Sequence, residues 1–237
     1  MEVRSQNVWT GAVSTNWNTD DNWSTNEIPA PGSSILIQQG SVRYPLITSE
    51  TVSAAQLTIE PGASLVVNGT GVLQVAGQLI VNGTLNLTNG MLVLNGNTPQ
   101  TVGGSQLSNN TVKDLRISNN VTITSTLNVS GVLSFGNVNN RTLNTGGFLV
   151  LKSNAAGTAR VADVTNGNIN SGNSINGLVT VEQFIPAGRK WRGLSAPLRG
   201  STNNSIFDNW QNGGVEEAAT GVLLLSLIHI SEPTRQA

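Results

Sequence analysis

The sequence has no cysteine and is poor in charged and aromatic residues. Charged residues make up 11% and aromatic residues 4% of its 237 positions, whereas globular domains commonly carry about 25% charged residues. Without cysteine, neither a disulfide nor a thiolate metal site can form. With a formal net charge of -1, the chain has no field that would steer nucleic acid or an anionic membrane surface toward it. These absences weigh against a disulfide-rich miniprotein, a nucleic-acid-binding protein and a cytosolic enzyme.

Long apolar runs are also missing. No stretch of about 18 apolar residues is present, so the sequence predicts no membrane-spanning segment. Met1–Gln6 lacks the apolar region of a secretory signal, so the signal of an exported protein would be missing from this sequence. Leu225–Arg235 resembles the translated read-through of a sequencing adapter. We therefore interpret 225–237 as an artefact rather than a genuine strand with a polar tail, and leave the single histidine, His229, out of the functional interpretation.

Short pairs of apolar residues at alternate positions dominate the sequence from Leu57 to Leu151. Most successive pairs start six to eight residues apart, with wider gaps before Leu115 and before Leu149, and Asn-Gly steps, which accept positive φ, separate several of them. This alternation predicts short β-strands with one side in a core. The pairs are Leu57/Ile59, Leu65/Val67, Leu73/Val75, Leu79/Val81, Leu85/Leu87, Leu92/Leu94, Leu115/Ile117, Val121/Ile123, Leu127/Val129, Leu133/Phe135 and Leu149/Leu151.

Two all-β architectures fit strands of this length. Asn-Gly between alternating strands favours an antiparallel meander or sandwich. Hairpins this short would be unstable, however, whereas coiling lets each strand pair in parallel with the strand one turn away. With three strands per turn the repeat is roughly 20 residues, within the range of solenoid proteins. The sequence therefore favours a parallel β-helix, or β-solenoid, and keeps the antiparallel fold as the alternative.

The segments flanking the repeats suggest a cap at one end and a second module at the other. A solenoid needs capped ends, because an open coil exposes apolar columns and unpaired strand edges. We expect a tryptophan-rich cap and first coil in 1–50 and solenoid repeats in 51–165. A linker or loop is expected in 166–178. The segment 179–224 is expected to start a second β module, truncated here, or to form a C-terminal cap.

Two residue groups are candidate binding sites. Trp9, Trp17 and Trp23 could stack sugars on an exposed face, although packing as the cap of the coil is the simpler interpretation. Asp20, Asp21 and Asn22 could contribute oxygen ligands to Ca²⁺, but three oxygens fall short of a full set and loop capping explains them as well.

No catalytic or cofactor-binding residues can be assigned from the sequence. Glycoside cleavage needs two carboxylates within about 5–10 Å, and the acidic residues Glu60, Asp114, Asp163 and Asp208 are scattered. The basic-aromatic cluster Arg189–Arg192 is too small a footprint for nucleic acid in a neutral chain.

Three motifs stand out along the chain. The first is Trp9-Thr-Gly, Asn16-Trp17-Asn and Asn22-Trp23-Ser with Tyr44-Pro45; the second is the repeat entry Leu57–Val67; the third is Val179–Arg192 with Leu194–Pro197. With these motifs the chain resembles a family of large secreted surface proteins of the Bacteroidota, many of them adhesin-like and exported by type IX secretion. The resemblance implies an extracellular or cell-surface location and a long multi-domain parent. It carries no catalytic residues to this chain.

Together these observations predict a non-catalytic structural or adhesin-like segment. Its partners would be glycans or other host or cell-surface material, with no cofactor, no nucleic acid and no membrane insertion. The alternative is a carbohydrate-binding module that uses the three tryptophans and is appended to a polysaccharide-degrading enzyme. A third hypothesis, a β-helix polysaccharidase, would need an acidic cluster in one groove.

Overall fold

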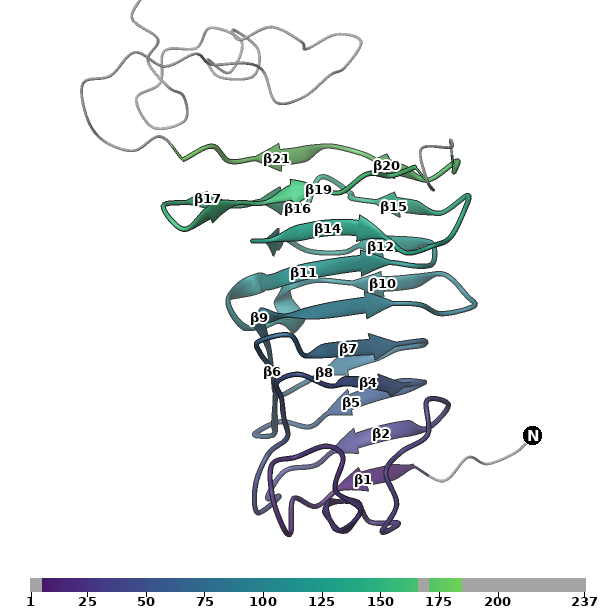
Figure 1. The fold of residues 1–237 in the computed structure, drawn as a ribbon, viewed down its shortest axis with the longest axis vertical. Helices are drawn as coiled ribbons and strands as arrows, with labels where there is room; N and C mark the ends of the chain where they lie inside the picture. The colour runs from purple at the N-terminus through teal and green to yellow at the C-terminus, as the bar shows by residue number, and fades with distance from the viewer. Residues whose placement is uncertain (1–5, 166–170, 185–237) are drawn as a thin grey trace, which may run out of the picture. The chain divides into compact units, whose positions relative to one another are not determined.

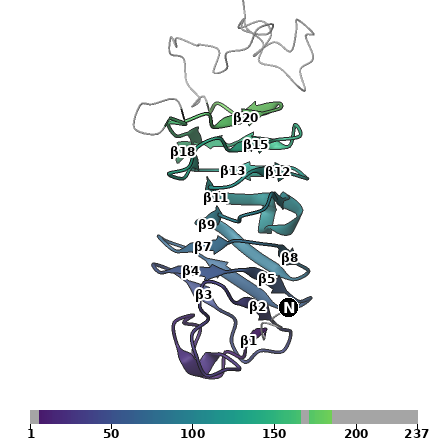
Figure 2. The same cartoon turned by 90° about the vertical axis from the view of Figure 1, so that its right-hand side faces the viewer.

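The computed structural model describes residues 6–165 and 171–184, and within these ranges the chain is all-β. Its strands wind into about 5 turns of a parallel β-solenoid, seen from two sides in Figure 1 and Figure 2. The helical segments of the described residues are three single 3₁₀ turns, η1 (Asp20–Asn22), η2 (Gly104–Gln106) and η3 (Ser108–Asn110). In these ranges no helix has the length and apolar character to cross a membrane.

The coils build three faces, and the coils between the first and the last described one contribute to all three. Face 1 holds β1 (Asn7–Trp9), β2 (Ser34–Ile37), β5 (Gln56–Ile59), β8 (Leu79–Val81), β10 (Gln100–Val102), β12 (Val121–Ile123), β15 (Thr142–Asn144) and β20 (Ser174–Asn176). Face 2 holds β3 (Leu46–Ile47), β6 (Ser64–Val67), the first parts of β9 (Thr84–Leu94) and β11 (Thr111–Ile117), β13 (Leu127–Val129), β16 (Leu149–Leu151) and β21 (Val179–Val181). Face 3 holds β4 (Thr51–Ala54), β7 (Val72–Val75), the ends of β9 and β11, β14 (Val132–Phe135) and β19 (Arg160–Val161).

The strand pairs of these three faces are parallel and keep a regular register. Ile35 lies beside Leu57, and Leu57 beside Leu79, so each step along this part of face 1 is 22 residues. Within the described ranges the antiparallel ladder is the small hairpin of β17 (Ser153–Asn154) and β18 (Gly157–Thr158), which projects from the last coils. The predicted parallel solenoid is confirmed, and the antiparallel meander or sandwich is wrong.

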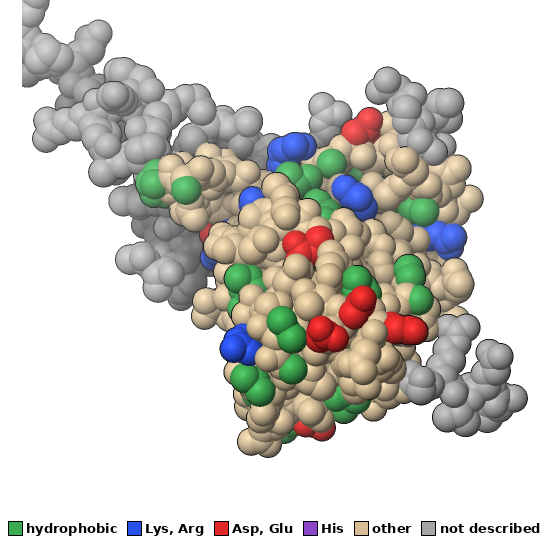
Figure 3. Space-filling model, turned by 60° about the horizontal axis from the view of Figure 1, so that its bottom comes forward, with side chains coloured by type: hydrophobic (Ala, Val, Ile, Leu, Met, Phe, Trp, Pro, Cys, Tyr) green, Lys and Arg blue, Asp and Glu red, His purple; other side chains and the backbone are tan. Residues whose placement is uncertain are grey.

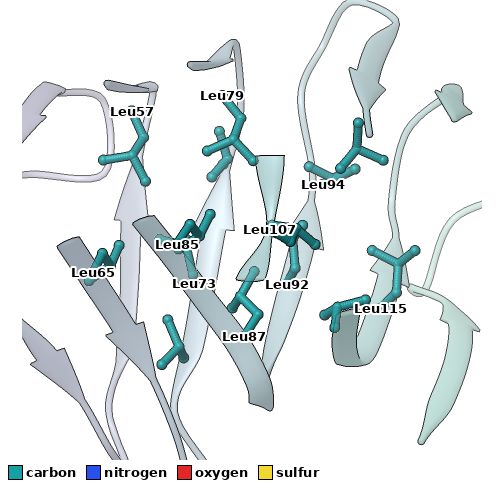
Figure 4. Packing of buried hydrophobic residues seen from close by; sticks show 14 of the residues in the cluster. Leu57, Leu65, Leu73, Leu79, Leu85, Leu87, Leu92, Leu94, Leu107 and Leu115 are labelled. Carbon is teal, nitrogen blue, oxygen red and sulfur yellow. The ribbon is translucent and has the colours of Figure 1, made fainter. Parts of the chain in front are cut away.

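The apolar pairs of the sequence form the interior. On face 3, Leu73, Leu92, Leu115 and Leu133 follow one another in register, and all four side chains are fully buried. Figure 4 shows Leu73, Leu92 and Leu115 among the leucines that fill the space between the faces. Each such side chain contributes roughly 1.5–3 kcal/mol when fully buried. Contacts between successive coils therefore contribute to the stability of the stack.

The strand β9 passes from face 2 to face 3 without a break. Its first residues pair with β6, and Met91–Leu94 pair with β7. Gly90 lies at the bend, where a Cβ atom would be 2.6 Å from the main-chain oxygen of Val67. A glycine is required here because the two coils approach too closely for any side chain.

The solenoid extends further than the sequence predicts. β20 pairs in parallel with β15, and β21 with β16, so both belong to the same stack. Of the segment 166–178, expected to be a linker or loop, the part Ser174–Asn176 is a strand of the stack, and Val179–Val181, expected to start a second module or a C-terminal cap, continues the solenoid. The rest of the expected module and the segment 225–237 lie outside the described residues.

Candidate functional site

The three tryptophans of the N-terminal segment form one buried cluster below the first coil. Trp9 ends β1, whereas Trp17 and Trp23 lie on the loop that follows it. The ring centroids of Trp17 and Trp23 are 4.7 Å apart with planes at 72°, and those of Trp9 and Trp23 are 5.0 Å apart at 85°. These edge-to-face contacts are a favourable geometry for aromatic rings. We call this loop and its rings the tryptophan cap.

The rings are not available to a sugar. Trp9, Trp17 and Trp23 are 0%, 1% and 1% exposed. The indole nitrogens are also satisfied internally, since Trp9 Nε1 donates to the oxygen of Arg43 at 2.7 Å and Trp23 Nε1 to that of Trp17 at 2.8 Å. A stacking platform needs coplanar rings with an open face, and this cluster has neither. The glycan-binding hypothesis for these three residues is wrong, because they pack as the end of the core.

The tryptophan cap also closes the lower sheet edge. Ser24 N donates to the oxygen of Val8 at 2.9 Å, and Val8 N donates to Ser24 Oγ at 3.0 Å. Trp9 and Trp23 form an antiparallel bridge beside them. The β1 edge is thereby paired within the chain, which is how native proteins prevent edge-to-edge association.

Asn22 holds the loop of the tryptophan cap together. Its Oδ1 accepts the N–H groups of Val13 at 3.0 Å and Ser14 at 2.9 Å. Its Nδ2 donates to Ser14 Oγ at 2.9 Å and to the oxygen of Asn16 at 2.8 Å. The side chain is fully buried, so these four bonds satisfy both ends of the amide. Asn22 is therefore a structural hub, and its oxygen is already engaged by two donors.

The neighbouring carboxylates do not converge on a metal-binding position. Asp20 and Asp21 are exposed, and Asp20 Oδ1 accepts the N–H of Ile28 at 3.1 Å. Within the described ranges no three His, Cys, Asp or Glu residues are grouped so as to hold a metal ion. Loop capping accounts for the Asp20 contact that the structure shows.

The other acidic side chains make separate main-chain contacts. Glu60 Oε2 accepts the N–H of Gln39 at 2.9 Å, and Asp114 Oδ1 accepts that of Val132 at 2.7 Å. Hydrogen bonds from Thr165 lower the pKa of Asp163. Asp208 lies outside the described residues, as do Arg189–Arg192 and His229. Glu60, Asp114 and Asp163 thus each accept a hydrogen bond from the main chain, and they do not form a carboxylate pair.

A cluster of side-chain amides beside β10, in which Gln100 and Asn119 are buried, was not predicted. Gln100 points inward, where Nε2 lies 2.9 Å from the oxygens of both Val75 and Gly77. Gln106 Nε2 donates to the oxygen of Leu79 at 2.7 Å. These bonds span the place where face 1 divides into two sheets, β1-β2-β5-β8 and β10-β12-β15-β20. We call Gln100, Gln106 and the buried Asn119, which contacts Gln100 Oε1 at 3.4 Å, the amide seam.

The part of the chain from β6 to the start of β11 carries no charged side chain. Residues 61–112 include no Asp, Glu, Lys, Arg or His. In Figure 3 most of the visible surface is uncharged polar side chain or backbone, with scattered acidic and basic groups. Stable protein surfaces commonly carry about 25–35% charged residues. The surface formed by residues 61–112 is therefore unusually neutral for a surface in water.

The fold and these contacts define a three-faced parallel β-solenoid whose N-terminal end is capped by tryptophan. A family model described as "Domain of unknown function (DUF8693)" matches residues 8–112, from the tryptophan cap to the start of β11. No curated protein matches the chain, and no solved structure matches it either. The matching family carries no described activity that could be compared with this chain.

Proposed function

We propose that this chain is a non-catalytic structural segment of an extracellular or cell-surface protein, which holds other parts of that protein at a fixed separation. Its outer faces, rich in uncharged Asn, Thr and Ser, would contact glycans or other surface material in an adhesin-like manner. The secreted setting is supported by the resemblance of the three sequence motifs to secreted Bacteroidota surface proteins.

One topological observation carries the spacer proposal. The described chain enters the stack at β1 and leaves it at β21, and these strands lie at opposite ends of the succession of coils (Figure 1). A compact enzyme domain commonly has neighbouring termini. A stack that separates its entry and exit by its whole length is suited to spacing what is attached at each end.

The separation can be measured directly. Face 1 holds eight strands in the described residues, so its ends lie about 34 Å apart at the usual spacing of about 4.8 Å. Because the chain has no cysteine, Thr25→Cys and Asn176→Cys introduce two unique spin-label sites on exposed residues. Double electron–electron resonance is expected to give one narrow distance distribution. A broad or multimodal distribution would argue against a rigid spacer.

The proposal that the chain is non-catalytic is tested by a separate assay. Incubation of the chain with a panel of neutral and acidic polysaccharides is expected to release no reducing ends and no unsaturated products. Retention of the chain on the same insoluble polysaccharides, measured by co-sedimentation, tests the adhesive part of the proposal. Turnover of any of these substrates would replace the structural proposal with an enzymatic one.

A further inference from the structure

The charged residues of the described chain are separated along the stack. Residues 6–60 contain five acidic residues and one basic residue, residues 61–112 contain no charged residue, and residues 113–165 contain two acidic and five basic residues. Figure 3 shows most of the acidic groups on the lower part of the visible surface and most of the basic groups on the upper part. The net charge of -1 therefore conceals a positive region in the later coils, which can attract an anionic ligand locally.

Three basic side chains lie on or beside the later part of face 3. Lys113 and Arg116 belong to β11, and Arg160 belongs to β19. All three are exposed, and within the described residues their side chains form no ion pair and no hydrogen bond. Lys152, by contrast, is paired with Glu182. We call Lys113, Arg116 and Arg160 the basic patch, because their charges are available to a partner.

The register of the parallel strands sets the spacing of the basic patch. Arg116 lies beside Ser134 of β14, and Arg160 lies beside Val132 of the same strand (Figure 1). Ser134 and Val132 flank the inward Leu133, so both arginines are on the outer side of face 3. Two steps between strands and an offset of two residues place their Cα atoms about 12 Å apart.

The acidic side chains of these coils are turned to the main chain. Asp114 Oδ1 accepts the N–H of Val132 at 2.7 Å, and a Cβ atom at Gly131 would clash with the same oxygen. The carboxylate of Asp163 accepts hydrogen bonds from the N–H and the hydroxyl of Thr165. Neither carboxylate is paired with a cation of the basic patch, which stays positive with Asp114 beside it.

We propose that the basic patch binds an acidic polysaccharide that carries a carboxylate on alternate sugars, which rests on the glycan contact of the proposed function. The planar guanidinium groups of Arg116 and Arg160 match carboxylates in bidentate geometry. An extended glycan covers the distance between the two arginine-bearing strands in a pair of sugar units. Successive carboxylates of such a polymer therefore reach both arginines.

Nucleic acid fits the basic patch less well. A single strand carries one phosphate about every 3.4 Å, which is far denser than arginines about 12 Å apart. Proteins that bind single strands also present aromatic side chains on which the bases stack. The outward residues beside the arginines are Val132 and Ser134, which offer no ring. Sparse cations favour a sparsely charged polymer.

Isothermal titration calorimetry of the whole chain with hyaluronan oligosaccharides tests the proposal, because hyaluronan carries a carboxylate on every second sugar. Oligosaccharides with several carboxylates are expected to bind, whereas the disaccharide with a single carboxylate should not, since it cannot reach both arginines. Binding should be lost in 1 M NaCl, where the screening length is about 3 Å. Binding of the disaccharide as tight as that of the longer chains would overturn the proposal.

Removing the three cations should weaken binding and leave the fold intact. The triple variant Lys113→Gln, Arg116→Gln and Arg160→Gln is expected to bind hyaluronan about tenfold more weakly, because each exposed ion pair contributes only modestly. Its urea midpoint should match that of the wild type, since all three side chains are exposed and unpaired in the described structure.

A matched variant separates the basic patch from the overall charge. Gln78→Glu, Thr122→Glu and Asn176→Asp change exposed residues on or beside face 1 and make the chain as negative as the first triple variant does. Because these positions are outside face 3, hyaluronan binding should fall by no more than about twofold. Equal losses in the two triple variants would overturn the basic patch and leave the glycan contact of the proposed function standing.

The remaining outcomes separate this proposal from the one on which it rests. If neither neutral dextran nor any acidic polysaccharide bound, both the adhesive part of the proposed function and the basic patch would be wrong. Retention on neutral polysaccharides without hyaluronan binding would contradict the basic patch alone. Binding of single-stranded DNA or of chondroitin sulfate more tightly than hyaluronan, lost in the first triple variant, would replace the carboxylate polymer with a phosphate or sulfate polymer.

Discussion

The side chain of Gln100 holds the main chain of Val75 one coil away, with Nε2 2.9 Å from the carbonyl oxygen. A side-chain amide here takes the place of the strand-to-strand hydrogen bonds that join the other coils of face 1. Gln100 also accepts the N–H of Gly96 at 2.8 Å, so both ends of its amide are used. The two sheets of face 1 are thus joined by the amide seam as well as by the continuous strands of faces 2 and 3.

Replacing Gln100 by leucine should weaken the stack although the volume changes little. The variant leaves the oxygens of Val75 and Gly77 and the N–H of Gly96 without this partner, and a buried unsatisfied group costs about 1–3 kcal/mol. We expect Gln100→Leu to lower the free energy of unfolding by about 2–3 kcal/mol in urea titrations. The matched control, Gln78→Leu, changes an exposed residue and should shift it by less than about 0.5 kcal/mol. Equal effects of the two changes would contradict the role of the seam.

Calcium should not stabilise the chain, because the Oδ1 atom of Asn22 already accepts two main-chain N–H groups. Thermal unfolding with excess Ca²⁺ and with a chelator is expected to give the same midpoint, since a ligand stabilises only the state that binds it. Asn22→Asp is expected to cost about 1–3 kcal/mol in both conditions, because the Nδ2 donor is lost. The metal site would instead be established if the midpoint of the wild type rose with Ca²⁺ and that of Asp20→Asn did not.

The interior column on face 3 should be far more sensitive than the residue beside it. Leu115 is fully buried, whereas Arg116, the next residue of β11, is exposed. Leu115→Ala is expected to lower the free energy of unfolding by about 2–5 kcal/mol through the lost contacts and the cavity. Arg116→Ala should stay within about 0.5 kcal/mol. Chemical denaturation of both variants measures the contrast, and a stable Leu115→Ala would show that this column is not packed.

The salt bridge between Lys152 and Glu182 joins the last described coils and should give a small acid-side pH dependence. Burial of the Glu182 carboxyl raises its pKa, but hydrogen bonds from Lys152 and from the N–H of Ser153, together with the charge of Lys152, bring it below its ordinary value of 4.5. The folded state therefore holds this proton less tightly than the unfolded state. The resulting stability is present above pH 4.5 and is lost as the pH falls through the lower pKa of the folded chain.

The direction of this pH dependence can be tested by urea titrations between pH 3 and pH 6. The proteins compared are the wild type, Glu182→Gln and Lys152→Met. Both substitutions should flatten the pH dependence in the same acidic window. Because both side chains are more than a third exposed, the effect should be small. The opposite result would be a wild type that becomes more stable than Glu182→Gln as the pH falls below 4.5. That result would mean that folding raises the pKa of Glu182 instead of lowering it.

Much of the fold could be predicted because the strand signal is local. Pairs such as Leu73/Val75 and Leu133/Phe135 mark inward positions, and their six- to eight-residue spacing leaves room only for short strands joined by tight corners. The end of the stack could not be predicted in the same way. Ile175 and Val179 follow a stretch rich in Asn, Ser and Gly that is typical of a linker, yet β20 and β21 keep the register of the coil below.

The sites were less predictable because they depend on side-chain direction. Three tryptophans in a loop have the same composition whether their rings lie on a surface or inside the tryptophan cap. In the sequence, a polar residue such as Gln100 is typical of a loop, so its buried position was missed. The alternation of Gln100 and Val102 follows the period of two of a strand and could have indicated an inward side chain. Asn22 offered no signal beyond its place after two aspartates.

The parallel stack is tested most directly by an NMR measurement of which strands neighbour Leu57. In uniformly labelled protein, the parallel stack predicts methyl contacts from Leu57 to Ile35 and to Leu79, 22 residues away on either side, with the main-chain contacts of parallel neighbours. Close Hα–Hα contacts between β5 and β6, which mark an antiparallel hairpin, would contradict it.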